Sequence, residues 1–334
     1  MELKHSENWN KEDPVKINSI KFNQDNSLFT LATSKGFRIF TANSYFLIHP
    51  IRKEIKEIGN ISIANVLYKS SLIFFVGNET NNNWKQNSLI IWDDTKNVKL
   101  GEIKLKDKII DFNLTKNVLS IFASNKIYIF ELISFKLVKV IDGLNINNKL
   151  FTYNMYDMIA YTTFKNKTEI NIKTINYNKN HKLETFYNRN FKVNFDNIQA
   201  LKISHSGQYI FVSSILGNKI HIYYVQNGNL RNCIYLGNKI SAIDNIDFNY
   251  SKESKILFIK EMNKICLFSI NENNLIPKCN CQKYNDNDLL NNTSKKNEGS
   301  GLMSMFKSYF KVYLYFFILF RNLIKQMRNY LLIF

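Results

Sequence analysis

The chain has 334 residues, of which 45% are hydrophobic and 14% aromatic, so it can bury one large core or two ordinary ones. Lysine and arginine total 45 against 27 acidic residues, and the net charge of +18 indicates either non-specific attraction to an anionic partner or a bland solvated surface. The composition therefore excludes a wholly disordered chain and leaves the kind of anionic partner open.

The chain begins with a polar segment, and its cysteines are few. Residues 1–16, MELKHSENWNKEDPVK, contain no apolar core of a secretory signal and are expected to form a polar N-terminal extension. Cys279 and Cys281 are separated by one residue, without a second cysteine pair or a nearby histidine, so a zinc site lacks two of its four ligands. We expect no metal, no cofactor and a reduced intracellular protein.

Residues 17–270 read as a repeat of short strands. The stretch IKFNQDNSLFTLATSKGFRIF (20–40) gives strand, turn, strand, turn and strand. The same order returns at 64–92, 109–130 and 198–224, and more weakly at 149–175 and 242–270. The average step of roughly 46 residues predicts an all-β propeller with four strands per blade, whose turns depend on Asn and Asp. Trp92 and Asp93 are interpreted as structural residues that close a blade.

The C-terminal part of the chain changes character twice. Residues 271–300 are polar and Asn-rich and predict a disordered loop. Residues 301–334 combine aromatic, aliphatic and basic residues and predict an amphipathic, membrane-associating helix. These features give four parts: an extension (1–16), the propeller (17–270), the loop (271–300) and the amphipathic segment (301–334).

Four motifs resemble a known family. They are the FNQD and SKGFRIF elements of residues 22–40, VLYKSSLIFFVG at 66–77, IIWDD at 90–94 and NKIYIFEL at 125–132. In this order and spacing they resemble the PROPPIN family, and the resemblance covers roughly residues 17–310. It implies a seven-bladed WD-repeat propeller that binds phosphatidylinositol 3-phosphate and 3,5-bisphosphate in autophagy. Six blades are recognisable, and the seventh is missing or replaced by the C-terminal segment.

The resemblance also implies where a lipid headgroup would bind. The family uses a Phe/Leu-Arg-Arg-Gly motif, but the corresponding slot here reads Ile234-Tyr235-Leu236-Gly237, so both arginines are replaced. His205 stands in a His-Ser-Gly turn, and Lys219 and His221 lie on the strand that carries a further arginine in the family. The implied but degenerate headgroup set is therefore His205, Lys219, His221, Tyr235, Leu236 and Gly237.

Two interpretations of this set stay open. Lipid binding could survive in weakened form through the two histidines and Lys219, with Arg231 or Lys239 adding charge, although a neutral imidazole contributes less than a guanidinium. Alternatively, the protein is an interaction propeller without phosphoinositide specificity. Loss of two bidentate contacts of about 1.5–3 kcal/mol each would weaken a site by well over a hundredfold, which favours lost or strongly reduced specific binding.

The C-terminal segment offers a separate membrane contact. GLMSMFKSYF (301–310) stands where the family has a membrane-inserting loop, which implies insertion through Phe306, Lys307, Tyr309, Phe310 and Lys311. At 100° per residue the five cations from Lys307 to Arg328 fall on one arc of about 100°, as in an interfacial helix. A transmembrane span competes with this interpretation, although the apolar run of residues 312–320 is shorter than the roughly 20 residues needed. Translated non-coding sequence is the third alternative.

The resemblance finally implies partners and a location. A face of the early blades recruits a large lipid-transfer protein in the family, and Asn23 and Asp25 belong to that region, although a simple Asx turn explains them equally well. We expect a monomeric, cytoplasmic protein, peripheral on autophagosomal precursor, endosomal or vacuolar membranes. No catalytic motif and no nucleic-acid recognition element stands out, so we expect neither an enzyme nor a nucleic-acid binder.

Overall fold

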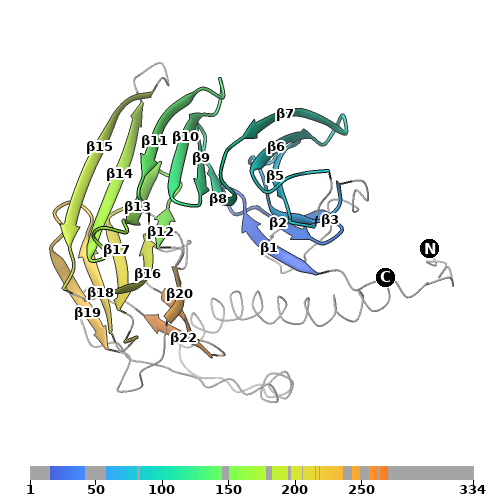
Figure 1. Ribbon diagram of the computed structural model, residues 1–334. Helices are drawn as coiled ribbons and strands as arrows, with labels where there is room; N and C mark the ends of the chain where they lie inside the picture. Colours follow the sequence, from blue (N-terminus) through green and yellow to red (C-terminus); the bar gives the residue numbers. More distant parts are fainter. Residues whose placement is uncertain are drawn as a thin grey trace, which may run out of the picture. The chain divides into compact units, whose positions relative to one another are not determined.

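The computed structural model describes residues 16–41, 58–80, 83–144, 150–177, 183–194, 197–204, 206–214, 216–217, 219–235, 243–248, 256–261 and 264–269. Every regular element in these ranges is a β-strand, which confirms the predicted all-β class. The strands form six antiparallel sheets, here called blades one to six in chain order. Within each blade, strands that follow one another in sequence lie side by side (Figure 1). β1 to β7 belong to one compact unit and β8 to β22 to a second.

The first unit contains blades one and two. Blade one consists of β1 (Ile17–Phe22), β2 (Leu28–Thr33) and β3 (Gly36–Thr41), and blade two of β4 (Ile61–Val66), β5 (Leu72–Gly77), β6 (Ser88–Asp93) and β7 (Val98–Lys104).

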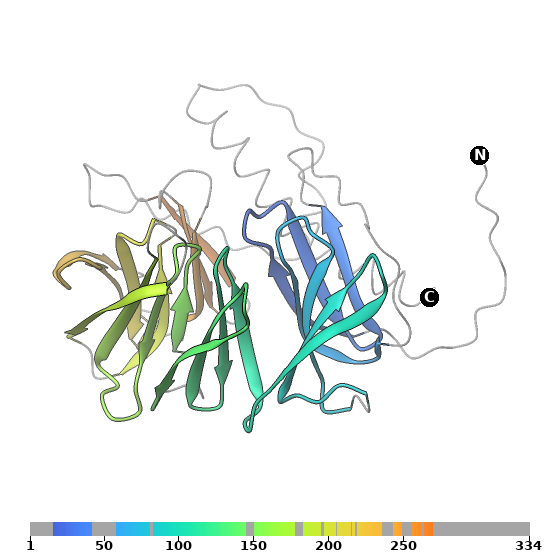
Figure 2. The same ribbon diagram turned by 90° about the horizontal axis from the view of Figure 1, so that it is seen from above.

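The second unit contains the other four blades, and each of its sheets is twisted (Figure 2). Blade three consists of β8 (Ile109–Leu114), β9 (Val118–Ala123), β10 (Lys126–Glu131) and β11 (Leu137–Asp142), and blade four of β12 (Phe151–Tyr153), β13 (Met158–Thr162), β14 (Glu169–Tyr177) and β15 (Leu183–Lys192). Blade five consists of β16 (Ile198–Ile203), β17 (Tyr209–Ser214), β18 (Lys219–Tyr224) and β19 (Leu230–Tyr235), and blade six of β20 (Ile243–Phe248), β21 (Ile256–Glu261) and β22 (Lys264–Ser269).

Inner and outer strands differ in burial. All six residues of β9 are buried, because both faces of an inner strand are covered. The outer strand β7 is exposed at most positions. The predicted repeat units therefore correspond to the inner three strands of each blade, whose third strand ends at Thr41, Asp93, Glu131, Tyr177, Tyr224 and Ser269.

Asn and Asp occupy three of the five non-glycine positions with positive φ in the described residues, and Tyr68 and Phe135 occupy the other two. Asn26, Asn97 and Asp157 adopt positive φ angles of 56°, 57° and 57°, a conformation that the short polar side chains of Asn and Asp tolerate. Asp93 accepts hydrogen bonds from the backbone N–H groups of Thr95 and Lys96 and so caps the turn after β6. This contact agrees with a structural role for the Trp92-Asp93 pair.

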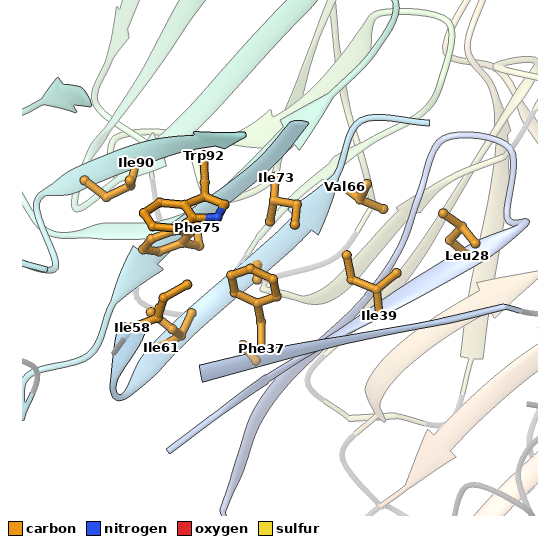
Figure 3. Packing of buried hydrophobic residues seen from close by; sticks show 12 residues of the cluster. Leu28, Phe37, Ile39, Ile58, Ile61, Val66, Ile73, Phe75, Ile90 and Trp92 are labelled. Atoms are coloured by element: carbon orange, nitrogen blue, oxygen red, sulfur yellow. The ribbon is translucent and has the colours of Figure 1, made fainter. Parts of the chain in front are cut away.

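Aromatic side chains fill the core of the first unit. Phe75 lies at its centre, with ring centroids 5.8 Å from Phe37, 5.7 Å from Trp84 and 6.3 Å from Trp92. Ile39 of blade one and Ile73 of blade two pack in the same cluster (Figure 3). Neither sheet could bury these side chains alone, so the two blades stabilise each other.

In the second unit, an apolar cluster joins each of the three pairs of consecutive blades. One apolar cluster joins blades three and four, the next joins blades four and five, and a third joins blades five and six. Blade five therefore packs on both faces: Val212 and Tyr223 face blade four, and Phe211 and Ile234 face blade six. This packing fixes the sheet that carries most of the predicted headgroup residues.

Candidate functional site

Blade five has two distinct ends, set by its antiparallel strand order. The β16–β17 turn and the β18–β19 turn lie at one end, here called the turn end. The connection from β17 to β18 and the last residue of β19, Tyr235, lie at the other end, here called the slot end. The predicted headgroup residues divide between these ends, and Lys219, His221 and Tyr235 come together near the slot end.

Lys219 and Tyr235 are cross-strand partners in the β18–β19 register. The Lys219 Nζ atom lies 5.0 Å from the centre of the Tyr235 ring, which is a cation–π contact. Tyr235, which the family resemblance places in the slot of the first arginine, is 63% exposed. The slot end thus presents an aromatic ring and one ammonium group to solvent.

His221 lies two residues along β18, opposite Cys233 of β19. Its Nδ1 atom is 3.1 Å from the Tyr223 hydroxyl oxygen. Burial, together with the nearby positive charge of Lys219, lowers the pKa of His221 from its ordinary 6.5. The imidazole is therefore mostly neutral at pH 7 and adds little positive charge to the site.

Tyr223 and Cys233 complete the buried side of this cluster. Burial raises the pKa of Tyr223, while a hydrogen bond from the backbone N–H of Asn194 lowers it. Burial also raises the pKa of the Cys233 thiol, against the effect of Lys219. The sequence analysis did not identify Asn194 as a neighbour. Its position in the loop before β16 could have indicated this contact, because the first residue of β16 lies at the slot end.

Other predicted cations do not join the slot end. Arg231 packs against Tyr209 and Tyr224, whose positions in β17 and β18 lie toward the turn end. His205 itself lies outside the described residues, and its neighbours Ser204 and Ser206 flank the β16–β17 turn. Lys239, Leu236 and Gly237 are also outside the described ranges.

The predicted membrane-inserting segment is likewise outside the described residues. This applies to Phe306, Lys307, Tyr309, Phe310 and Lys311, and to the loop of residues 271–300. Among the described residues, none forms a helix with the length and apolarity that a membrane crossing requires.

The FNQD turn of the first unit joins its two blades. The buried Asn23 amide donates to the Tyr68 carbonyl oxygen at 3.0 Å, and Asn23 Oδ1 accepts from the Leu28 N–H at 3.0 Å. Gln24 donates to the Val66 carbonyl oxygen and accepts from the Tyr68 N–H, at 3.4 and 2.5 Å. These bonds connect the β1–β2 turn to the β4–β5 turn, so Asn23 has a structural role.

Asp25 differs from Asn23 in its exposure to solvent. Burial alone would raise the pKa of its carboxyl, but hydrogen bonds from the Ser27 hydroxyl and backbone N–H hold that pKa below the ordinary 3.8. The carboxylate is therefore charged and accessible, as a residue that contacts a partner must be.

Metal ligation finds no support in the described part of the chain. There, histidine, cysteine, aspartate and glutamate side chains nowhere gather in a group of three that could hold a metal ion. Cys279 and Cys281 lie outside the described residues.

Known proteins are similar to this chain in sequence and in fold, although no protein-family model matches it. SVP1-like protein 2 of Schizosaccharomyces pombe is 27% identical over 216 residues, which are 64% of this chain and 56% of that protein. Autophagy-related protein 18e of Arabidopsis thaliana is 29% identical over 134 residues, 39% of this chain and 34% of that protein. The chain thus spans less than two thirds of the length of these relatives.

A solved structure supports the predicted architecture. Hsv2 of Kluyveromyces lactis superposes with a TM-score of 0.63 at 20% identity, over 77% of this chain and 74% of Hsv2. This likeness concerns the fold alone and confirms the β-propeller class, with a blade count consistent with a partial propeller. Together, the sequence relatives and the shared fold indicate a propeller of PROPPIN type.

Proposed function

We propose that this protein is a peripheral membrane scaffold in autophagy-related membrane biogenesis. Its relative in Arabidopsis thaliana is named an autophagy-related protein, and its fold is that of Hsv2. The proposal includes a cytoplasmic location on autophagosomal precursor, endosomal or vacuolar membranes. It also holds that the protein acts by binding and not by catalysis.

The state of the slot end carries the proposal that phosphoinositide binding is weakened. A phosphomonoester carries up to two negative charges, and a guanidinium binds it through two parallel hydrogen bonds. Here the slot of the first arginine is Tyr235, and the ammonium of Lys219 lies over its ring. His221 is mostly neutral at pH 7. Among the described residues of this end, the ammonium of Lys219 therefore supplies the one full positive charge. Recognition of phosphatidylinositol 3-phosphate and 3,5-bisphosphate would therefore be much weaker than with two arginines.

An interaction propeller without phosphoinositide specificity is the second candidate function. The exposed ring of Tyr235 favours it, because an exposed tyrosine is a common anchor in protein interfaces and not a phosphate ligand of arginine's strength. The two candidates differ in one property, namely whether membrane binding depends on the identity of the headgroup.

Liposome flotation of the full chain separates these candidates. Vesicles would carry either phosphatidylinositol 3-phosphate or the same charge density of phosphatidylserine. We expect the wild type to distinguish them weakly, and the double substitution Tyr235→Arg, Leu236→Arg to bind the phosphoinositide at least tenfold more tightly. Tyr187→Arg together with Leu216→Arg adds the same charge at two exposed positions and is the matched control. If both double variants gain equally on both vesicles, no headgroup pocket remains.

The C-terminal segment completes the membrane proposal. Residues 301–334 would anchor the protein through an interfacial helix, with Phe306, Tyr309 and Phe310 in the acyl boundary and the cations toward anionic headgroups. Removal of residues 301–334 should abolish binding to phosphatidylserine vesicles. Binding to those vesicles that persists after truncation would exclude this segment as the anchor.

The protein partner is proposed from the family resemblance. A large lipid-transfer protein of autophagy would dock on the face that carries the FNQD turn. The exposed carboxylate of Asp25 is the better candidate contact, because the Asn23 side chain is 3% exposed and bonded within the unit. Asp25→Lys should therefore reduce recovery of that protein in co-purification and leave the thermal stability nearly unchanged.

A further inference from the structure

Arg231 is the extra residue of a β-bulge in blade five. The β18–β19 register runs from Lys219 opposite Tyr235 to Ile222 opposite Asn232, and the next pair is Tyr223 opposite Leu230. Arg231 is thus skipped in the pairing. A bulge of this kind redirects the side chain of the extra residue, and bulges are frequent beside functional sites.

The bulged side chain lies over two tyrosines. The Arg231 Cζ atom is 4.3 Å from the ring centre of Tyr209 and 5.9 Å from that of Tyr224. These tyrosines are cross-strand partners, and their ring centres are 5.5 Å apart. The guanidinium therefore reaches across β18 to β17 and rests on aromatic rings, an arrangement that restricts its orientation.

Aromatic packing leaves the hydrogen-bonding capacity of this guanidinium available. Ring contacts cover its flat face, whereas its N–H donors point outward from the edge of the plane. Among the residues that the structure describes, none accepts a hydrogen bond from Arg231 or forms an ion pair with it. Tyr224 and Leu230 beside it are 39% and 50% exposed. The cluster of Tyr209, Tyr224, Leu230 and Arg231, here called the arginine cluster, is thus open to solvent at Tyr224 and Leu230, whereas Tyr209 and Arg231 are partly buried.

The internal repeat shows that the fold does not require this cluster. Blades two and three contain the same bulge between their third and fourth strands. In blade two the bulged residue is Leu100, and the cross-strand pair beside it is Leu72 and Asp93. In blade three the bulged residue is Val138, and the pair is Val118 and Glu131. The bulge is therefore shared with blades two and three, whereas the arginine and the two tyrosines are absent from the equivalent positions of those two blades.

We propose that the arginine cluster binds a carboxylate in an acidic segment of a partner protein. The cluster supplies one positive charge, which matches one carboxylate, and the planar fork suits two parallel hydrogen bonds to its oxygens. Exposed Leu230 and Tyr224 would contact apolar side chains next to the acidic residue. A phosphomonoester, with up to two negative charges, would need further cations. This site lies toward the turn end, so it goes beyond the proposed membrane function of the slot end.

The test measures binding of a fluorescein-labelled deca-glutamate peptide to the full chain by fluorescence anisotropy. Arg231→Leu should weaken binding about tenfold, and Arg231→Lys by several-fold because an ammonium lacks the fork. Blade two has leucine at the equivalent bulge, so the Arg231→Leu variant should fold. Arg189→Leu removes an exposed arginine of β15 and should leave binding within twofold.

Three results would overturn the proposal. Equal losses in the Arg231→Leu and Arg189→Leu variants would mean that the peptide senses only net charge. Unchanged binding in Arg231→Leu would exclude the cluster as the site. Inorganic phosphate that displaces the peptide at concentrations where acetate does not would identify a phosphoryl ligand. Flotation of Arg231→Leu on phosphatidylserine vesicles should match the wild type, so a failure here is distinct from a failure of the membrane proposal.

Discussion

The FNQD turn of the first unit and the slot end of blade five both resemble the same family, yet their side chains serve different purposes. In the FNQD turn, Asn23 and Gln24 hydrogen-bond to backbone groups of blade one and blade two. At the slot end, Tyr235 is mostly exposed, and the ammonium of Lys219 lies over its ring. One motif is bonded into the unit and the other faces solvent.

This difference explains how the family resemblance can hold in one motif and fail in the other. A side chain that pairs buried backbone groups cannot be lost without leaving those groups unsatisfied, at a cost of about 1–3 kcal/mol each. A surface pocket can lose its arginines while the strands beneath it stay paired, as β18 and β19 do here. A motif that matches the family therefore indicates that the fold is shared, whereas a motif that departs from it indicates a change in the binding site.

The largest expected effect is at Asn23. Asn23→Ala leaves the buried N–H of Leu28 without its side-chain acceptor and the Tyr68 carbonyl without its donor, so unfolding should become easier by about 2–3 kcal/mol. Urea denaturation of the full chain measures this change. Asp25→Ala, at an exposed position in the same turn, should stay within about 0.5 kcal/mol. Equal effects of the two substitutions would contradict the contrast between them.

Gln24→Ala should have an intermediate effect. The Gln24 amide hydrogen-bonds to backbone groups of Val66 and Tyr68 from a partly exposed position. Water can replace part of each hydrogen bond, so we expect the free energy of unfolding to fall by about 1 kcal/mol. Gln24→Glu is the sharper variant, because a carboxylate accepts from the Tyr68 N–H but cannot donate to Val66. Thermal denaturation should place Gln24→Glu between the wild type and Gln24→Ala, whereas equal losses in the two variants would show that the Val66 bond dominates.

His221 should give a smaller, pH-dependent effect. Because the folded-state pKa lies below 6.5, the unfolded state binds more protons in the window between the two values. Wild-type stability is therefore fully present above about pH 6.5 and falls as the pH drops through the folded-state pKa. His221→Gln should flatten this decline, measured by thermal denaturation at pH 7.5 and 5.5. Parallel declines in the two proteins would show that His221 titrates normally.

Substitution of Lys219 should change the stability least and lipid binding most clearly. Its contact with the exposed ring of Tyr235 is worth about 0.5 kcal/mol, so Lys219→Ala should hardly change the denaturation curve. Its flotation on phosphatidylinositol 3-phosphate vesicles should fall several-fold, because the slot end loses its cation. Lys136→Ala, at an exposed turn of blade three, controls for net charge. A stability loss as large as that of Asn23→Ala would remove the distinction between the two regions.

The propeller could be predicted from the sequence to a considerable extent. The recurring strand, turn and strand order placed the repeats on the inner three strands of the blades, because apolar runs between Asn- and Asp-rich turns reflect local rules. The outer strands, such as β7, were harder to predict because half-exposed strands carry weak apolar patterns. The amphipathic role of residues 301–334 stays a prediction, because these residues lie outside the described ranges.

The sequence by itself determined the strand order, the presence of Tyr235 and Leu236 where the family resemblance implies two arginines, and the presence of Arg231, because these follow from residue identity and spacing. Only the tertiary structure decided which of these residues meet. It assigned Lys219 and His221 to the slot end with Tyr235, and it stacked Arg231 on Tyr209 and Tyr224 through a bulge. Register and bulges depend on how neighbouring strands pair, so one skipped residue in β19 determines where the arginine points.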